Sequence, residues 1–445
     1  VALRNLKDGA GNLIEAPEVF RAFRDDTLTD NEAIEARRPA MEDIFATLED
    51  AGIAREELYL AWDFNVASVR DITERVLHIR DEAFAELANA APTFSVTDVV
   101  DFEPCDASGC QEGQSEEISR EISGTFQVPN FLDSDDGGPG SAFFYDTPDD
   151  GLPDRMGGDN LLDAVLLCRV PRSVAEDFEQ EPTVVARAYF FGHGLLGDVS
   201  EIREPQNNAM MNEHQMMLCA TNWIGFSSKD TAAAAQALGE WSQMAVLIDQ
   251  QVQSYLNAMY LARLLKHPQG LASDPAFHAG GQPVFDTSTV YFDSDSLGAV
   301  MGGGLMGVIQ DVTRGVLGVP GMSYSMLLRR SKNWATYGIF MTGAAGAGGY
   351  PDAKDQTFLL SMIQMLWDRS ESSGYAYHIA DNLLPNTPSH DVLLHVAYGD
   401  HSVSMWAADM LARTLDAGLR VPTLEEGRHP DANPYVGLEP IPAGD

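Results

Sequence analysis

Lysine and cysteine are scarce in this chain, and long apolar runs are missing. Only five of its 445 residues are lysine and only four are cysteine. Asp and Glu total 67 against 28 Lys and Arg, so the formal net charge is −39 at pH 7. A surface of this sign repels phosphate backbones and anionic lipid headgroups, which argues against nucleic acid as a partner. Apolar stretches fall well short of the roughly 20 residues that a membrane-spanning helix needs, so no membrane span is expected.

The four cysteines form a close pair and a distant pair. Cys105 and Cys110 lie in CDASGC, a spacing that a small disulfide loop can close. Cys168 and Cys219 lie in apolar, strand-like segments and are predicted to bridge neighbouring strands. Four buried free thiols are the alternative. We interpret the pairs as two disulfides and expect a secreted, periplasmic or cell-surface protein.

The pattern of apolar residues changes near residue 160. With 44% hydrophobic residues the chain is long enough to bury a large core. Residues 1–160 mix helical spacing with short strand-like pieces, which predicts an accessory region of mixed α and β. In residues 161–445 buried strands alternate with amphipathic helices, which predicts an α/β domain. Its sheet is expected to be mostly parallel, with helices on both faces and sites at the carboxyl ends of the strands.

The stretch VYFDSDSLGAVMGGG at residues 290–304 is typical of a strand that turns abruptly into a glycine-rich helix. A nucleophile elbow needs small residues two positions before and after the nucleophile, because the two backbones nearly touch there. Ser296 meets this requirement with Ser294 and Gly298. Ser294 does not, because Phe292 lies two positions before it. We predict Ser296 as a nucleophile, with a tight turn that carries no chemistry as the alternative.

A second glycine-rich loop, FGHGLLGD, follows an earlier strand. The backbone amide of Leu195 is predicted to join that of Leu297 in an oxyanion hole. His193, beside Gly194, is interpreted as a structural imidazole that anchors this loop. We prefer that role to general base because His193 precedes Ser296 in the chain.

A serine nucleophile needs a histidine base and an acid that orients it. In hydrolases with a nucleophile elbow the chain order is serine, acid, histidine, so both residues are expected after Ser296. Asp400 in AYGDHSV ends a late strand and is the predicted acid, a role compatible with capping a helix. His401 is adjacent to Asp400, where the geometry of a triad is rare. His429 is therefore the predicted base. The alternatives are that His429 is a surface histidine, that His401 serves, or that the base lies beyond residue 445.

These segments together resemble a known superfamily. FGHGLLG, the corner YFDSDSLGAVMGG and LLHVAYGDHSV are similar to segments of secreted bacterial proteins of the α/β-hydrolase superfamily, described as hydrolases or lipases. The resemblance covers most of the chain. It implies that Ser296 is the nucleophile, Asp400 the acid and the loop from His193 to Leu195 the oxyanion element. It also implies a histidine-containing segment beyond residue 445. Relatives usually show Asp-Gly-x-Ser-Gln-Gly-Gly at the corner, where this chain departs at Ser294, Leu297 and Ala299.

The leading hypothesis is a secreted serine esterase or lipase-type hydrolase that cleaves small-molecule or polymeric carboxylic esters through an acyl-enzyme. A catalytically inactive descendant that binds a partner at a surface or in a matrix is the alternative. A peptidase or amidase is the third hypothesis, because the same triad serves amides. No motif indicates a metal site or an organic cofactor, so neither is expected.

Overall fold

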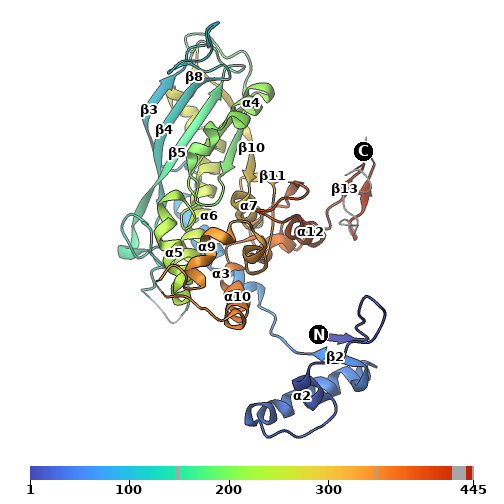
Figure 1. Ribbon diagram of the computed structural model, residues 1–445. Coiled ribbons are helices and arrows are strands. Elements are labelled where there is room, and N and C mark those ends of the chain that lie inside the picture. The colour runs from blue at the N-terminus through green and yellow to red at the C-terminus, as the bar shows by residue number, and fades with distance from the viewer. Residues whose placement is uncertain (147–149, 347, 423–436, 443–445) are drawn as a thin grey trace. The chain divides into compact units, whose positions relative to one another are not determined.

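The chain folds into two compact units, Val1–Ser68 and Val69–Asp445. The computed structural model describes residues 1–146, 150–346, 348–422 and 437–442. Each unit has its own buried apolar core, so each is described by itself. Figure 1 shows the course of the chain through the helices and strands of both.

The first unit contains two helices and a two-stranded antiparallel sheet. Strand β1 (Ala2–Arg4) pairs with β2 (Leu58–Ala61), and α1 (Glu18–Arg24) and α2 (Glu32–Asp50) lie between them in the chain. The side chain of Asn31 accepts hydrogen bonds from two amides in the first turn of α2, which fixes where that helix begins. The core of this unit consists of Ala16, Phe20, Phe23, Met41, Phe45, Leu58 and Ala61.

The second unit is built on an eight-stranded mixed sheet, with strands in the order β12-β11-β10-β6-β7-β5-β4-β3. The strands from β12 to β7 are parallel to one another, and β5, β4 and β3 pair antiparallel. Their bounds are β3 Phe94–Asp101, β4 Ile118–Pro129, β5 Leu161–Pro171, β6 Ala186–Gly192, β7 Met216–Ala220, β10 Phe285–Asp295, β11 Val312–Gly318 and β12 Asp391–His395.

The order of the strands reverses between β6 and β10. After β6 the chain continues to β7 on one side, and after β10 it continues to β11 on the other side. The loops that leave these two neighbouring strands therefore diverge and leave a crevice at their carboxyl ends. In open α/β sheets this is the place where ligands bind.

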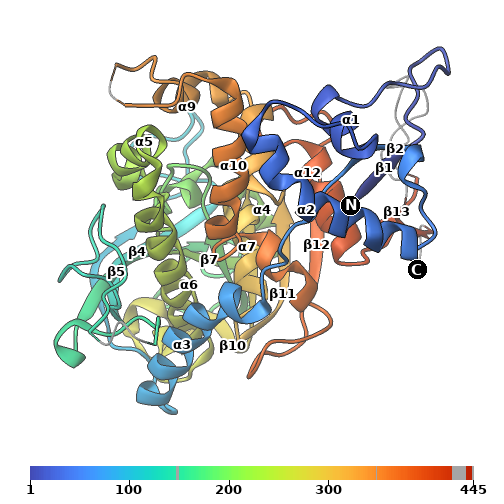
Figure 2. The same cartoon turned by 90° about the horizontal axis from the view of Figure 1, so that it is seen from below.

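Helices cover both faces of the sheet, as the sequence predicts. Phe190 of β6 belongs to the large core under α6 (Met244–Lys266), whereas Phe191 belongs to a smaller cluster with Met211 of α4 (Pro205–His214). Successive side chains of a strand point to opposite faces, so the two helices lie on opposite sides. Helices α3 (Val69–Leu87) and α7 (Leu297–Met306) contribute to the same large core as α6 (Figure 2).

The predicted accessory region of residues 1–160 is not one unit in the structure. Helix α3 and strands β3 and β4 belong to the second unit, and the division falls between Ser68 and Val69. Strand β3 has no buried residue, unlike the continuous apolar runs of buried parallel strands. Strand β4 is mostly buried, but polar residues interrupt its sequence ISREISGTFQVP. Both strands therefore differ in sequence pattern from the parallel strands, although all belong to one sheet.

A run of short helices follows β11, and another helix follows β12. The bounds are α8 Tyr324–Leu327, α9 Trp334–Met341, α10 Ala353–Trp367, α11 Ser372–Tyr375 and α12 Met405–Thr414. Helix α9 packs on α5 (Thr231–Gly239), which precedes α6. None of the helices in the described part of the chain is long and apolar enough to cross a membrane.

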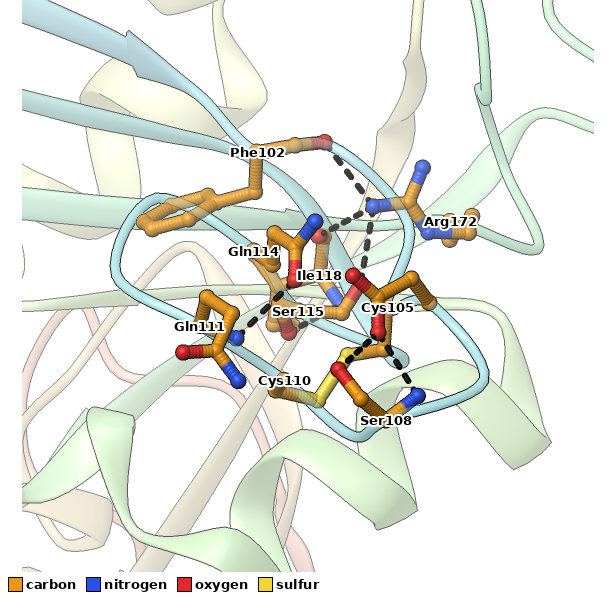
Figure 3. The surroundings of a disulfide bond; sticks show 10 residues. Phe102, Cys105, Ser108, Cys110, Gln111, Gln114, Ser115, Ile118 and Arg172 are labelled. Atoms are coloured by element: carbon orange, nitrogen blue, oxygen red, sulfur yellow. Dashed lines mark hydrogen bonds between the residues drawn. A yellow bond between two sulfur atoms is a disulfide. The ribbon is translucent and has the colours of Figure 1, made fainter.

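Both predicted disulfides are present. Cys168 and Cys219 are directly opposite each other on β5 and β7, with Cα atoms 4.0 Å apart. The Cys105–Cys110 bond closes a small loop between β3 and β4 (Figure 3). Arg172 lies beside this loop and donates hydrogen bonds from Nη2 to the carbonyls of Phe102 and Ser115.

The two disulfides are expected to differ in their effect on stability. Loop-closure entropy assigns about 4 kcal/mol to the bond that spans 51 residues and about 2 kcal/mol to the bond that spans 5. Replacing Cys168 and Cys219 with Ala should therefore lower the free energy of unfolding, measured by urea denaturation, more than replacing Cys105 and Cys110. An equal or reversed order would contradict the assignment of Cys168–Cys219 as the main covalent constraint.

Candidate active site

Ser296 lies at the sharp junction between β10 and α7. Its backbone has φ 59° and ψ −119°, a conformation that costs a residue with a Cβ roughly 1 to 3 kcal/mol. The amide of Ser296 donates to the carbonyl of Gly318 at 2.9 Å, and its own carbonyl accepts from the amide of Ala299 at 3.0 Å. Ser296 therefore has the strand-to-helix geometry that the sequence predicts for a nucleophile elbow.

The small residues around this corner are required by close contacts. A Cβ on Gly298 would lie 2.0 Å from the carbonyl oxygen of Gly192, and a Cβ on Gly302 would lie 2.5 Å from the ring of Phe292. Ser294 is fully buried, and its hydroxyl donates to the carbonyl of Val316 at 3.2 Å. Ser294 is thus occupied within the sheet.

His193 is held between two backbone groups in the loop after β6. Its Nε2 accepts a hydrogen bond from the amide of Trp223 at 2.9 Å, so Nδ1 carries the proton and donates to the carbonyl of Gly194 at 2.8 Å. Burial lowers the pKa of His193 to about 4, against the smaller opposing effect of the Gly194 bond. Both ring nitrogens are used, which fits an anchor of the loop better than a base.

Glu201 is a second anchor of this loop that the sequence did not reveal. Its Oε2 accepts from the amide of Gly194 at 2.8 Å, and its carboxylate fills the space that a Cβ on Gly197 would need. Burial raises the pKa of Glu201, although the Gly194 bond acts in the opposite direction. No motif marks this residue, because the contact depends on how the loop folds back on the turn that follows it.

Leu195 and Leu297 are the residues whose amides the sequence predicts for an oxyanion hole. Within the described residues, the amide of Leu195 has no hydrogen-bond partner, whereas that of Leu196 donates to Phe226. Leu297 is the first residue of α7, so its amide has no partner inside the helix. Both residues line one cavity together with Ser296.

Asp400 caps the turn that leads into α12. Its Oδ1 accepts from the amide of Ser402 at 2.6 Å and from that of Val403 at 3.2 Å. Ser402 and Val403 line the same cavity as Ser296, so this loop reaches the elbow. His401 is exposed, and its carbonyl accepts from the amide of Lys332 at 2.6 Å. The predicted base His429 lies outside the described residues.

A different histidine lies in register with the elbow. Asp295, Gly318 and His395 are paired across the three parallel strands β10, β11 and β12. Because Gly318 has no side chain, the Asp295 carboxylate lies over it, and a Cβ there would be 2.0 Å from Oδ1. Burial raises the pKa of Asp295, and the charge of His395 lowers it. No motif marks His395, since register across three strands is not visible in the sequence.

The cavity beside Ser296 has a volume of about 90 Å³ and is mostly apolar. Its lining includes the polar residues Ser296, Ser331, Asn333 and Ser402, together with tyrosines and tryptophans that carry a hydroxyl or an N–H group. Much of the remaining wall comes from α5, α6, α7 and the helices that follow β11, with Leu238, Leu247, Val300, Tyr337 and Trp367 among its members, and the loops after β6, β7 and β12 complete it. Within the described parts of the chain, no group of three or more His, Cys, Asp or Glu side chains is placed to hold a metal ion.

The strand order, the helices on both faces and the elbow at the end of β10 define an α/β-hydrolase fold. No protein-family model matches the chain, and no curated protein matches its sequence.

Solved structures with similar folds include acetyl xylan esterase 1 from Thermoanaerobacterium sp. JW/SL YS485, with 10% identity, coverage of 80% of this chain and 98% of that one, and a TM-score of 0.38. The acylaminoacyl peptidase of Pyrococcus horikoshii covers 57% of this chain, with 12% identity and a TM-score of 0.32. A puromycin-hydrolyzing peptidase of Mycobacterium tuberculosis covers 66% of it, with 11% identity and a TM-score of 0.35. The chain spans 33% and 40% of the lengths of these two peptidases. The likeness is one of general fold.

His193 should make the stability of the second unit depend on pH. Its pKa of about 4 in the folded state lies below the ordinary value of 6.5, so its neutral form stabilises the fold above pH 6.5. This stabilisation, on the order of 3 kcal/mol, is lost as pH falls from 6.5 to 4. His193→Gln should therefore cost most near pH 7 and progressively less toward pH 4, measured by urea denaturation.

Leu264→Ala serves as the control, because Leu264 is fully buried on α6 and carries no titratable group. Its cost should stay constant over the same range of pH. A cost of His193→Gln that also stays constant would contradict a neutral imidazole in the fold.

Proposed function

We propose that the chain is a serine hydrolase that cleaves carboxylic esters through an acyl-enzyme on Ser296. The observation that carries this proposal is the strained backbone of Ser296 at the mouth of an apolar cavity. Strain of this kind persists where the surrounding structure imposes it, and such sites cluster where function uses them. A tight turn without chemistry does not explain why the cavity opens at the same residue.

In the proposed reaction, the Ser296 hydroxyl attacks the ester carbonyl while a histidine accepts its proton. The amides of Leu195 and Leu297 donate to the carbonyl oxygen as it becomes negative. The same histidine then protonates the leaving alkoxide as the C–O bond breaks, which leaves the acyl group on Ser296. Water, deprotonated by the histidine, hydrolyses this ester and restores the free serine. Asp400 is proposed to orient the histidine.

The proposed base is a histidine close to Asp400 or after it. His429 is the base that the chain order favours. His401, which directly follows Asp400 in the sequence, is the alternative. His395 is a third candidate for the base, because the strand register places it at the same end of the sheet as the elbow. A base beyond residue 445 is the fourth possibility, as the resemblance implies.

An oxidising compartment is proposed as the place where the protein works. Two disulfides support this location, since such bonds persist mainly in secreted, periplasmic and cell-surface proteins. The net charge of −39 is consistent with an uncharged ester as substrate, because a nucleic acid would be repelled.

A non-catalytic binding protein is the second candidate. It is favoured by Asp400, whose Oδ1 is engaged by the amides of Ser402 and Val403. Within the described parts of the chain, no histidine hydrogen-bonds Asp400. A fold that has lost its base would retain the cavity and bind a ligand without turning it over.

Replacement of Ser296 separates the two candidates. Ser296→Ala should abolish hydrolysis of p-nitrophenyl esters and labelling by a fluorophosphonate probe, because both need the hydroxyl. Thermal stability should change little, since Ala keeps the same Cβ. Ser294→Ala is the matched control, two residues away in the same corner, and should keep turnover and label. Turnover that survives Ser296→Ala would sink the assignment of the nucleophile.

Three single variants locate the base. His395→Gln, His401→Gln and His429→Gln are compared by kcat with one activated ester, and loss of the base should lower kcat by about 10³-fold or more. The other two variants should change kcat by less than about tenfold. If none of the three lowers kcat strongly, while the wild type hydrolyses the ester, none of these three histidines is the base.

A further inference from the structure

The cavity beside Ser296 limits which ester the site accepts. We propose that it is the acyl-binding pocket and that it selects short, uncharged acyl groups of roughly four carbons. This inference rests on the proposed function and specifies its substrate class.

The distribution of polar groups gives the orientation of the substrate. Ser296, Ser331, Asn333 and Ser402 line the cavity, and its aromatic residues carry the hydroxyls of Tyr324 and Tyr337 and the indole N–H groups of Trp334 and Trp367. Among the described residues, no charged side chain belongs to the lining. The remaining wall is aliphatic and aromatic. An acyl chain would bury apolar surface there, whereas a carboxylate or ammonium group would lose its hydration without an ion partner. Dicarboxylic and amino acyl groups are therefore excluded.

We assign the cavity to the acyl group of the ester and not to its alcohol, because the cavity adjoins the amides that are proposed to bind the carbonyl oxygen. The cavity wall includes Leu195 and Leu297, whose amides are proposed to hold the carbonyl oxygen, and Val300, one turn further along α7. A carbonyl fixed by these amides therefore lies at the cavity itself. The alcohol must leave toward the base, which is proposed to be oriented by Asp400.

The volume sets the length of the chain. An apolar cavity of about 150 Å³ accommodates benzene, which has six carbons. In proportion, the 90 Å³ of this cavity accommodates roughly four carbons. Longer chains would need the walls to move.

The walls are held by packing and by a buried carboxylate. The ring of Trp334 lies over Gly338 on α9, where a Cβ would be 2.5 Å from it. Tyr324 packs on Trp367 with ring centroids 5.3 Å apart. Glu371 is fully buried and accepts hydrogen bonds from the amides of Ser323 and Tyr324, which fixes the start of α8. The limit on length is therefore built into the fold.

The test is kcat/KM for p-nitrophenyl esters from acetate to dodecanoate, together with a series of alkyl acetates. We expect kcat/KM to rise about fourfold per methylene up to butanoate. It should then fall at least tenfold by octanoate. The length of the alcohol should change kcat/KM by less than threefold. A flat profile from acetate to dodecanoate, or selection by the alcohol instead, would overturn the inference and leave the proposed function intact.

Variants of α5 and α6 test the wall directly. Leu247→Ala should move the optimum to hexanoate or longer, and Ala234→Leu should reduce turnover of butanoate while sparing acetate, because both residues line the cavity. Leu264→Ala is the matched control on α6, equally buried but outside the cavity, and should keep the wild-type optimum. An unchanged optimum in both folded cavity variants would overturn the inference.

Calorimetry of the Ser296→Ala protein with the same esters keeps the two proposals distinguishable. If the wild type hydrolyses none of the esters, the proposed function fails. The pocket is then still supported by affinity that peaks at butanoate, and it is overturned by affinity that is absent or independent of length.

Discussion

The approach of α7 to the end of β6 is the constraint on which the candidate site depends. Gly298 touches the carbonyl oxygen of Gly192 with no room for a side chain between them. The loop with His193 and Glu201 begins at Gly192, and the elbow ends at Gly298. One backbone contact therefore brings the proposed nucleophile and the oxyanion amides to the same point. The cavity beside Ser296 is lined by residues of this loop, of α7 and of the helices after β11.

Ionisable groups buried near the elbow have opposing effects on stability. Burial is the main cause that raises the pKa values of Asp293 on β10 and of Glu371 to about 7. A carboxyl with a raised pKa stabilises the fold fully below its ordinary pKa, and this stabilisation is lost as pH rises to 7. His193 changes in the other direction over much of the same range. The two trends partly offset each other, so this acidic chain can keep buried carboxyls beside a neutral imidazole.

Local signals in the sequence predicted the parallel half of the sheet, the strained corner and both disulfides. Each of these depends on a few adjacent residues, such as Ser294 to Gly298, or on apolar strands next to cysteines. The signals missed contacts between distant segments. Glu201 meets Gly194 only after a turn folds back, and the cavity wall combines α5 and α6 with helices that come about a hundred residues later.

The boundary near residue 160 differs for a related reason. Strands β3 and β4 join the sheet through antiparallel pairs. The strand–helix alternation that indicates a parallel sheet in the sequence is therefore missing there. The roles of Ser296, Asp400 and His429 stay predictions. The strand-to-helix geometry at Ser296 supports its role. The carboxylate of Asp400 accepts hydrogen bonds from backbone amides, and His429 lies outside the described residues.

The bond between Cys168 and Cys219 closes a covalent ring that contains β6, the loop with His193 and all of α4. Exposed residues such as Val185 lie in the connection inside this ring. A protease that cuts there opens the ring without releasing a fragment. The cleaved chain would run as one band in electrophoresis until a reductant is added, and only then as two. In a medium rich in proteases, the loop with His193 thus stays attached to the sheet after a first cut.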